Sequence, residues 1–154
     1  MHVIVGGQAS PRSLRIAARY ADEFNLSGAT PDQAVERYAR LDEACRDIGR
    51  DPSTMRRSVM ASTFVGSNDA EVERRLAAFQ ELVAGADETI DKSRAADEWF
   101  EDHRDRVVIG TPGEALAMIG RYADAGAERI MLQDLIPWDL DMIDLLGREV
   151  VGRI

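Results

Sequence analysis

The sequence has too few cysteines and histidines for a disulfide framework or a histidine-rich metal site. Cys45 is the single cysteine, which rules out an internal disulfide, and the two histidines, His2 and His103, are not at metal-ligand spacing from it. No apolar run approaches the roughly 20 residues that span a bilayer, and no basic-then-apolar leader opens the chain. We therefore expect no metal site, no membrane contact and a location in the cytoplasm.

Positive charge and aromatic side chains are also scarce. The 19 basic residues are scattered among 28 acidic ones, the formal net charge is −9, and aromatic residues make up 6% of the chain. Phosphate neutralisation requires a basic face, and single strands require aromatic stacking platforms, so these values argue against a nucleic-acid partner. The hydrophobic fraction of 45% is ordinary for a globular protein, and the length fits a single domain, 1–154.

What the sequence does contain is a regular alternation of short apolar runs and amphipathic patterns. The runs expected to be strands are residues 3–5, 23–26, 58–65, 107–109 and 130–132. Ser10-Pro11 and the capping boxes at Thr30 and Thr111 predict the helix starts that follow some of these runs. Residues 85–106 are strongly charged and less regular, and we expect an insertion there that contains a helix.

Strands that alternate with helices favour parallel pairing through right-handed crossovers. The order therefore predicts an α/β fold of about three to four βα units plus the inserted helix. Such a set of units forms either half of an eight-stranded (β/α)8 barrel or a small open sheet.

Three stretches of the chain resemble one family in their order and spacing. The first is VIVGG at 3–7, followed by RSLRIAARYADEFN at 12–25, and the second is LDEACRDIGRDP at 41–52. The third joins IGTPGE at 109–114 to YADAGA at 122–127 and IML at 130–132. Together they resemble the C-terminal half of the luciferase-like monooxygenases, particularly the branch that uses coenzyme F420.

This resemblance implies a partial (β/α)8 barrel and hydride transfer between a deazaflavin and a small organic substrate. FMN is the alternative cofactor. Family members are longer than this chain, and their first strands carry much of the flavin-ring pocket. The resemblance therefore implies a fragment or a subunit of a split enzyme, which supplies the phosphate side of the pocket. A non-catalytic, oligomeric half-barrel is the other interpretation, and no residue is assigned a catalytic role.

The first candidate site lies where the first strand runs into a helix. Gly6, Gly7 and Gln8 connect the two, and glycine permits close backbone approach while a helix N-terminus favours an anion. We expect these residues, with Arg12, to contact the cofactor. The competing interpretation is a tight turn that needs glycine for its own geometry.

The second candidate group is expected at the same end of the barrel, where active sites gather. Asn25, Ser27 and Gly28 follow the next strand, and Trp138 follows the last one. We expect them to bind the substrate, although the polar residues are equally good turn residues and Trp138 suits packing under the last helix.

The expected partners follow from the open edges of a half-barrel. Unpaired strand edges and an uncovered inner face favour association. We therefore expect either a homodimer or a complementary N-terminal half-barrel chain.

Overall fold

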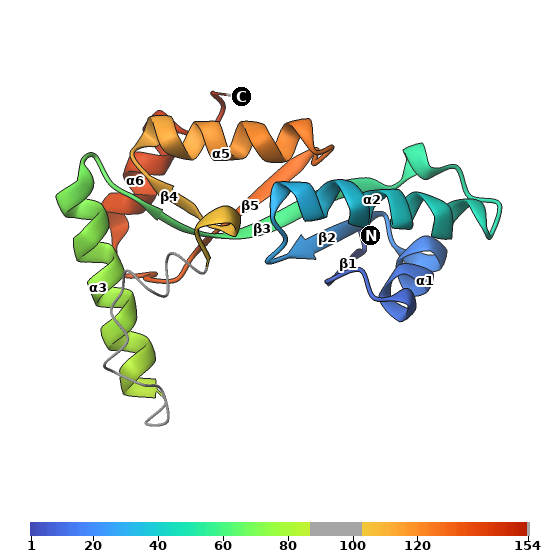
Figure 1. Ribbon diagram of the computed structural model, residues 1–154, viewed down its shortest axis with the longest axis horizontal. Helices are drawn as coiled ribbons and strands as arrows, with labels where there is room; N and C mark the ends of the chain where they lie inside the picture. Colours follow the sequence, from blue (N-terminus) through green and yellow to red (C-terminus); the bar gives the residue numbers. More distant parts are fainter. Residues whose placement is uncertain (87–102, 154) are drawn as a thin grey trace. The chain divides into compact units, whose positions relative to one another are not determined.

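The computed structural model describes residues 1–86 and 103–153, and its strands and helices alternate along the chain (Figure 1). The strands are β1 (Ile4–Gly7), β2 (Glu23–Ser27), β3 (Arg56–Val65), β4 (Val108–Gly110) and β5 (Arg129–Asp134). The helices are α1 (Pro11–Tyr20), α2 (Pro31–Arg46), α3 (Asp69–Ala86), α5 (Pro112–Asp124) and α6 (Leu140–Glu149), with short 3-10 turns η1 (Pro52–Thr54) and η2 (Arg104–Arg106). All the expected strands are confirmed, and most of the expected insertion lies outside the described residues.

The strands pair in parallel along most of the sheet. β1 pairs with β2, β2 with β3, and β3 with β4, each in parallel, while β5 also pairs with β3. This pairing confirms the predicted α/β fold with parallel strands. Within the described residues, no helix is long and apolar enough to cross a membrane.

The described residues group into two compact units. The first contains Met1–Ala61 and Ile119–Leu132, and the second contains Ser62–Met118 and Gln133–Ile154. Strands β3 and β5 and helix α5 each contribute residues to both. Each unit has its own buried side chains and is described separately below.

The core of the first unit forms where α1 and α2 cover one face of β1 and β2 (Figure 1). Phe24 and Leu26 of β2 are fully buried, because alternate residues of a strand point to the same face. Leu41 and Cys45 of α2 are buried as well, one helical turn apart. Burial raises the pKa of the Cys45 thiol, so this cysteine is a core residue and a poor nucleophile.

The helix starts of the first unit are those that the sequence predicts. The Ser10 hydroxyl accepts a hydrogen bond from the Ser13 N–H at 3.2 Å, and Pro11 occupies the first helical position of α1. At α2 the capping box is complete: Thr30 Oγ1 accepts from the Gln33 N–H, and Gln33 Oε1 accepts from the Thr30 N–H, each at 3.2 Å.

The second unit has a separate apolar cluster. Its buried members are Phe64, Val72, Leu76, Val107 and Ile136. The Phe64 ring also meets the ring of Phe79 with centroids 5.3 Å apart, in a tilted arrangement. Asp139 caps α6 by accepting a hydrogen bond from the Met142 N–H.

Candidate functional site

The two glycines of β1 and the polar residues of β2 lie on neighbouring strands. Gly6 is in register with Asn25, and Gly7 with Leu26, in a parallel pair. Parallel strands end at the same edge of a sheet, so the β1–α1 and β2–α2 turns lie side by side there. The structure therefore places Gly6, Gly7, Asn25 and Ser27 at one edge of the sheet.

The β1–α1 turn adopts a backbone that demands special residues. Gly7 has φ of 155°, which L side chains rarely adopt, so glycine is required by its own geometry. Ala9 has φ of 59° and is fully buried, although it is not a glycine. Gln8 and Arg12 are exposed on either side of Ala9 and Ser10.

The N-terminus of α1 is also electrostatically open to an anion. Its first turn has no acidic residue and carries the exposed Arg12, whereas α2, α3, α5 and α6 each have an acidic residue in their first turn. A carboxylate at that position already occupies the positive end of a helix dipole. Of these five helices, α1 is thus the one whose first turn has no such carboxylate.

Asn25 makes contacts that its sequence position did not reveal. Its side chain is buried, and Nδ2 donates to Ser58 Oγ at 2.9 Å and to Met131 Sδ at 3.5 Å. The amide nitrogen therefore already donates to residues of β3 and β5. A substrate contact from Asn25 would have to use Oδ1.

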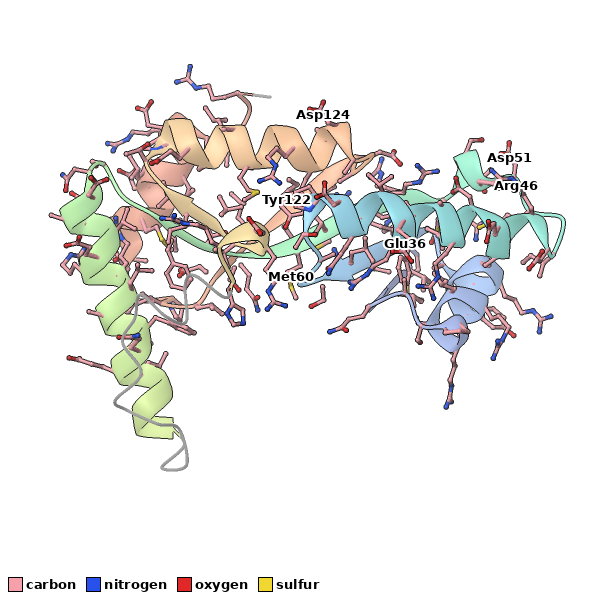
Figure 2. The ribbon with its side chains drawn as sticks, in the orientation of Figure 1. Glu36, Arg46, Asp51, Met60, Tyr122 and Asp124 are labelled. Atoms are coloured by element: carbon pink, nitrogen blue, oxygen red, sulfur yellow. The ribbon has the colours of Figure 1, made fainter. Side chains whose placement is uncertain are left out.

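The β2–α2 turn is held by Tyr122, which the sequence marked only as the first residue of the YADAGA stretch. The hydroxyl of Tyr122, labelled in Figure 2, donates to the carbonyl of Ala29 at 2.7 Å, and both residues are buried. Gly28 precedes this contact with φ of 62° and is exposed, and Ser27 is half-buried. The turn is thus fixed from α5 while its two candidate binding residues stay accessible.

A buried charge lies on the inner face of β2, two residues before Asn25. Glu23 is fully buried, and its Oε2 lies 3.0 Å from His2 Nε2 and 3.2 Å from Arg129 Nη1. Burial raises the pKa of Glu23, but hydrogen bonds from Ser58 and His2 and the charge of Arg129 outweigh burial, so the net pKa is lowered. Sequence reasoning missed this cluster, although a carboxylate at the start of an otherwise apolar strand was a usable signal. The contact with Oε2 also gives His2 a structural role, as a side chain that pairs with the buried Glu23 carboxylate.

Trp138 belongs to the second unit, in the loop between β5 and α6. Its side chain is 62% exposed, so it is not packed beneath the last helix. In the same loop, Asp134 Oδ1 accepts a hydrogen bond from the Ile136 N–H at 2.8 Å. Among residues 1–86 and 103–153, no group of three or more histidines, cysteines and carboxylates is placed to hold a metal ion.

Comparison with known proteins identifies the family. A sequence model of the luciferase-like monooxygenases matches residues 2–129 of this chain. The chain belongs to the luciferase-like monooxygenase family. This luciferase-like chain is also 27% identical, over 138 residues, to a phthiodiolone/phenolphthiodiolone dimycocerosates ketoreductase of Mycobacterium tuberculosis; the match covers 89% of this chain and 30% of the ketoreductase.

Solved structures of luciferase-like enzymes share the fold. An F420-dependent secondary alcohol dehydrogenase, solved with an F420–acetone adduct, superposes with a TM-score of 0.72 at 17% identity; the match covers 97% of this chain and 48% of that one. A coenzyme F420-dependent tetrahydromethanopterin reductase of Methanopyrus kandleri gives 0.68 at 15% identity, covering 96% and 49%. The oxygenating constituent of 3,6-diketocamphane monooxygenase of Pseudomonas putida, solved with FMN, gives 0.65 at 19% identity, covering 99% and 48%.

These likenesses confirm the predicted partial (β/α)8 barrel. The luciferase-like chain spans about half the length of each of these solved structures and less than a third of the ketoreductase. Two of these solved structures are described as F420-dependent, and one was solved with FMN.

Proposed function

We propose that this chain forms part of an F420-dependent oxidoreductase and supplies the phosphate side of its cofactor pocket. The bound deazaflavin would exchange a hydride with a small organic substrate. The β1–α1 turn, with Gly6, Gly7, Gln8 and Arg12, would contact the cofactor. Membership of the luciferase-like family is the observation that carries this proposal.

The names of relatives support carbonyl and alcohol redox chemistry. One relative is named a ketoreductase, and one structural neighbour is an F420-dependent secondary alcohol dehydrogenase. Both names describe the interconversion of a ketone and a secondary alcohol. We therefore favour F420 and a neutral carbonyl or alcohol substrate, with FMN as the second candidate because one neighbour was solved with FMN.

The residues present fit a phosphate at the β1–α1 turn. Glycine at position 7 leaves the backbone accessible, the first turn of α1 lacks acidic residues, and Arg12 is exposed there. The protein would bind and orient the cofactor, and the cofactor itself would supply the redox chemistry. On the substrate side we assign Ser27 and Gly28 at the end of β2, and Asn25 through its Oδ1.

A binding titration tests the proposal directly. We expect the full chain to bind F420, followed by fluorescence, and Arg12→Glu to weaken that binding by about tenfold because it places a like charge beside a phosphate. Arg19→Glu is the matched control, since Arg19 lies in the last turn of the same helix and is also exposed. Equal affinity for all three chains would remove the turn from the site, and a preference for FMN would select the second candidate.

Turnover needs a separate measurement, because the chain spans about half of its solved relatives. We expect little or no oxidoreductase activity from the chain alone, and activity when an N-terminal half-barrel chain is supplied. Robust turnover by the purified chain would contradict this expectation. Failure to bind F420 and FMN in both preparations would favour the non-catalytic, oligomeric half-barrel.

A further inference from the structure

Ala9 is the one residue other than glycine with a positive φ in the described part of the chain. The left-handed region places the Cβ of an L-residue too close to its own backbone, so such a residue persists only where its surroundings hold it. Ala9 is fully buried in the β1–α1 turn. Side chains of neighbouring elements therefore lie within reach of this strained residue.

Arg40 of α2 provides that contact. Its Nη2 donates to the carbonyl oxygen of Ala9 at 2.8 Å, across 31 residues of sequence. The guanidinium is partly oriented by Glu36, one helical turn earlier (Figure 2), whose Oε1 lies 4.0 Å from Arg40 Nη1. Glu36 is mostly exposed, so the ion pair is weak, whereas a charged donor on a buried carbonyl is among the stronger hydrogen bonds.

The position of the Ala9 carbonyl also determines where the next N–H points. The described residues contain no cis peptide bond, so the Ala9 C=O and the Ser10 N–H share one plane and point in opposite directions. Arg40 draws the carbonyl toward α2, and the Ser10 N–H is therefore directed away from α2. Within the described part of the chain this N–H has no protein acceptor.

We infer that Arg40 is a positioning residue for the cofactor: it holds Ala9 in the left-handed conformation and so presents the Ser10 N–H to the phosphate side of the pocket. This inference rests on the proposed function, because it assumes that the β1–α1 turn contacts the cofactor. Arg40 itself contacts the turn from the α2 side, through the Ala9 carbonyl. No sequence motif marked it, since Arg40 reads as one of several charges on α2.

The chain offers a matched control at the other end of α1. Arg50 Nη1 donates to the carbonyls of Ala18 at 3.0 Å and Ala21 at 2.8 Å. Arg50 thus holds the C-terminal end of the same helix through the same chemistry. Removing it should destabilise the packing of α1 without changing the conformation of Ala9.

The experiment compares Arg40→Met, Arg40→Lys and Arg50→Met in the full chain. Carbon-13 chemical shifts of Ala9 report its φ, circular dichroism reports folding, and fluorescence titration with FMN and with F420 reports cofactor affinity. We expect Arg40→Met to move the Ala9 shifts out of the left-handed range and to weaken cofactor binding by about tenfold. Arg40→Lys should retain most of the left-handed Ala9 shifts and most of the cofactor affinity. Arg50→Met should lower the melting temperature and leave the Ala9 shifts unchanged.

An additional variant separates the backbone effect from a loss of charge. On an Ala9→Gly background the left-handed conformation costs little, so Arg40→Met should weaken cofactor binding less than it does beside Ala9. Unchanged Ala9 shifts in folded Arg40→Met would overturn the inference, as would unchanged affinity despite altered shifts. If the wild-type chain binds neither cofactor, the proposed function fails, and the Ala9 shifts still decide whether Arg40 holds the turn.

Discussion

Arg75 and Asp139 form a two-point ion pair inside the second unit. Arg75 Nε donates to Asp139 Oδ2 at 2.8 Å, and Nη2 donates to Oδ1 at 3.3 Å. The Arg75 side chain is 1% exposed, and Nη1 also donates to the carbonyl of Val65 at 2.8 Å. One guanidinium therefore joins α3, the end of β3 and the cap of α6.

Replacing Arg75 should cost more stability than any nearby charge change. Arg75→Met leaves the Asp139 carboxylate and the Val65 carbonyl without their buried donor, and we expect a loss of about 3–5 kcal/mol in the free energy of unfolding. Urea unfolding measures it. Arg74→Met is the control, because Arg74 is 58% exposed and 3.5 Å from Asp139, and it should cost less than about 1 kcal/mol. Equal costs for the two variants would contradict the buried-pair interpretation.

Acid should destabilise the chain through the carboxylates of Asp139 and Glu23. Hydrogen bonds from Arg75 lower the pKa of Asp139 against the opposing effect of burial, and Glu23 also has a lowered pKa. Both groups release their protons more readily in the folded state than in the unfolded one. Their contribution is therefore complete above the unfolded pKa values, about 4, and is lost as the pH falls from there through the lower folded pKa values.

Unfolding free energies measured between pH 7 and pH 3 test this dependence. We expect a plateau near neutral pH and a decline below about pH 5. Glu23→Gln should lower the plateau and flatten the decline, because it removes one of the titrating groups. A stability that rises toward pH 3 would refute the assignment.

Gly7→Val should impair cofactor binding more than folding. A Cβ at Gly7 would meet the Cβ of Ser13 at 3.7 Å, an ordinary contact, so the cost comes from φ of 155° and from the blocked approach to the backbone. We expect cofactor affinity to fall by about tenfold, or about 1.4 kcal/mol, by titration in a reconstituted barrel. Gly49→Val is the control, since Gly49 also has a positive φ, of 74°, but lies beyond the end of α2 and outside the proposed site. Unchanged affinity in folded Gly7→Val would leave the turn a purely structural role.

The purified chain should associate in solution. In the second unit Trp138 is 62% exposed, Leu140 68% and Ile143 47%, and in the first unit Ile4 of β1 is 43% exposed. Apolar surface of this kind favours an interface, although the net charge of −9 opposes it. Light scattering at micromolar concentration should give about twice the 17.0 kDa chain mass. A monomer that persists at high concentration would leave a complementary half-barrel chain as the expected partner.

Local signals in the amino-acid sequence were sufficient to predict the order and type of the elements. Short apolar runs, proline after a serine or threonine cap, and glycine after strands act over a few residues, so local chemistry was enough to place β1, α1, β2 and α2. The same local signals, taken in order, carried the family resemblance. They also indicated that Gly6 and Gly7 end a strand where a helix begins.

The contacts of the polar side chains, in contrast, depend on how the elements pack together. Glu23 with Arg129, Tyr122 with the Ala29 carbonyl, and Arg40 with the Ala9 carbonyl are pairs separated by 31 residues or more of sequence. No local pattern encodes such a pair, because the register of parallel strands and the packing of helices on them bring its members together. In the sequence Arg40 resembles any solvated charge on a helix. It reaches the Ala9 carbonyl only because α2 packs beside the β1–α1 turn.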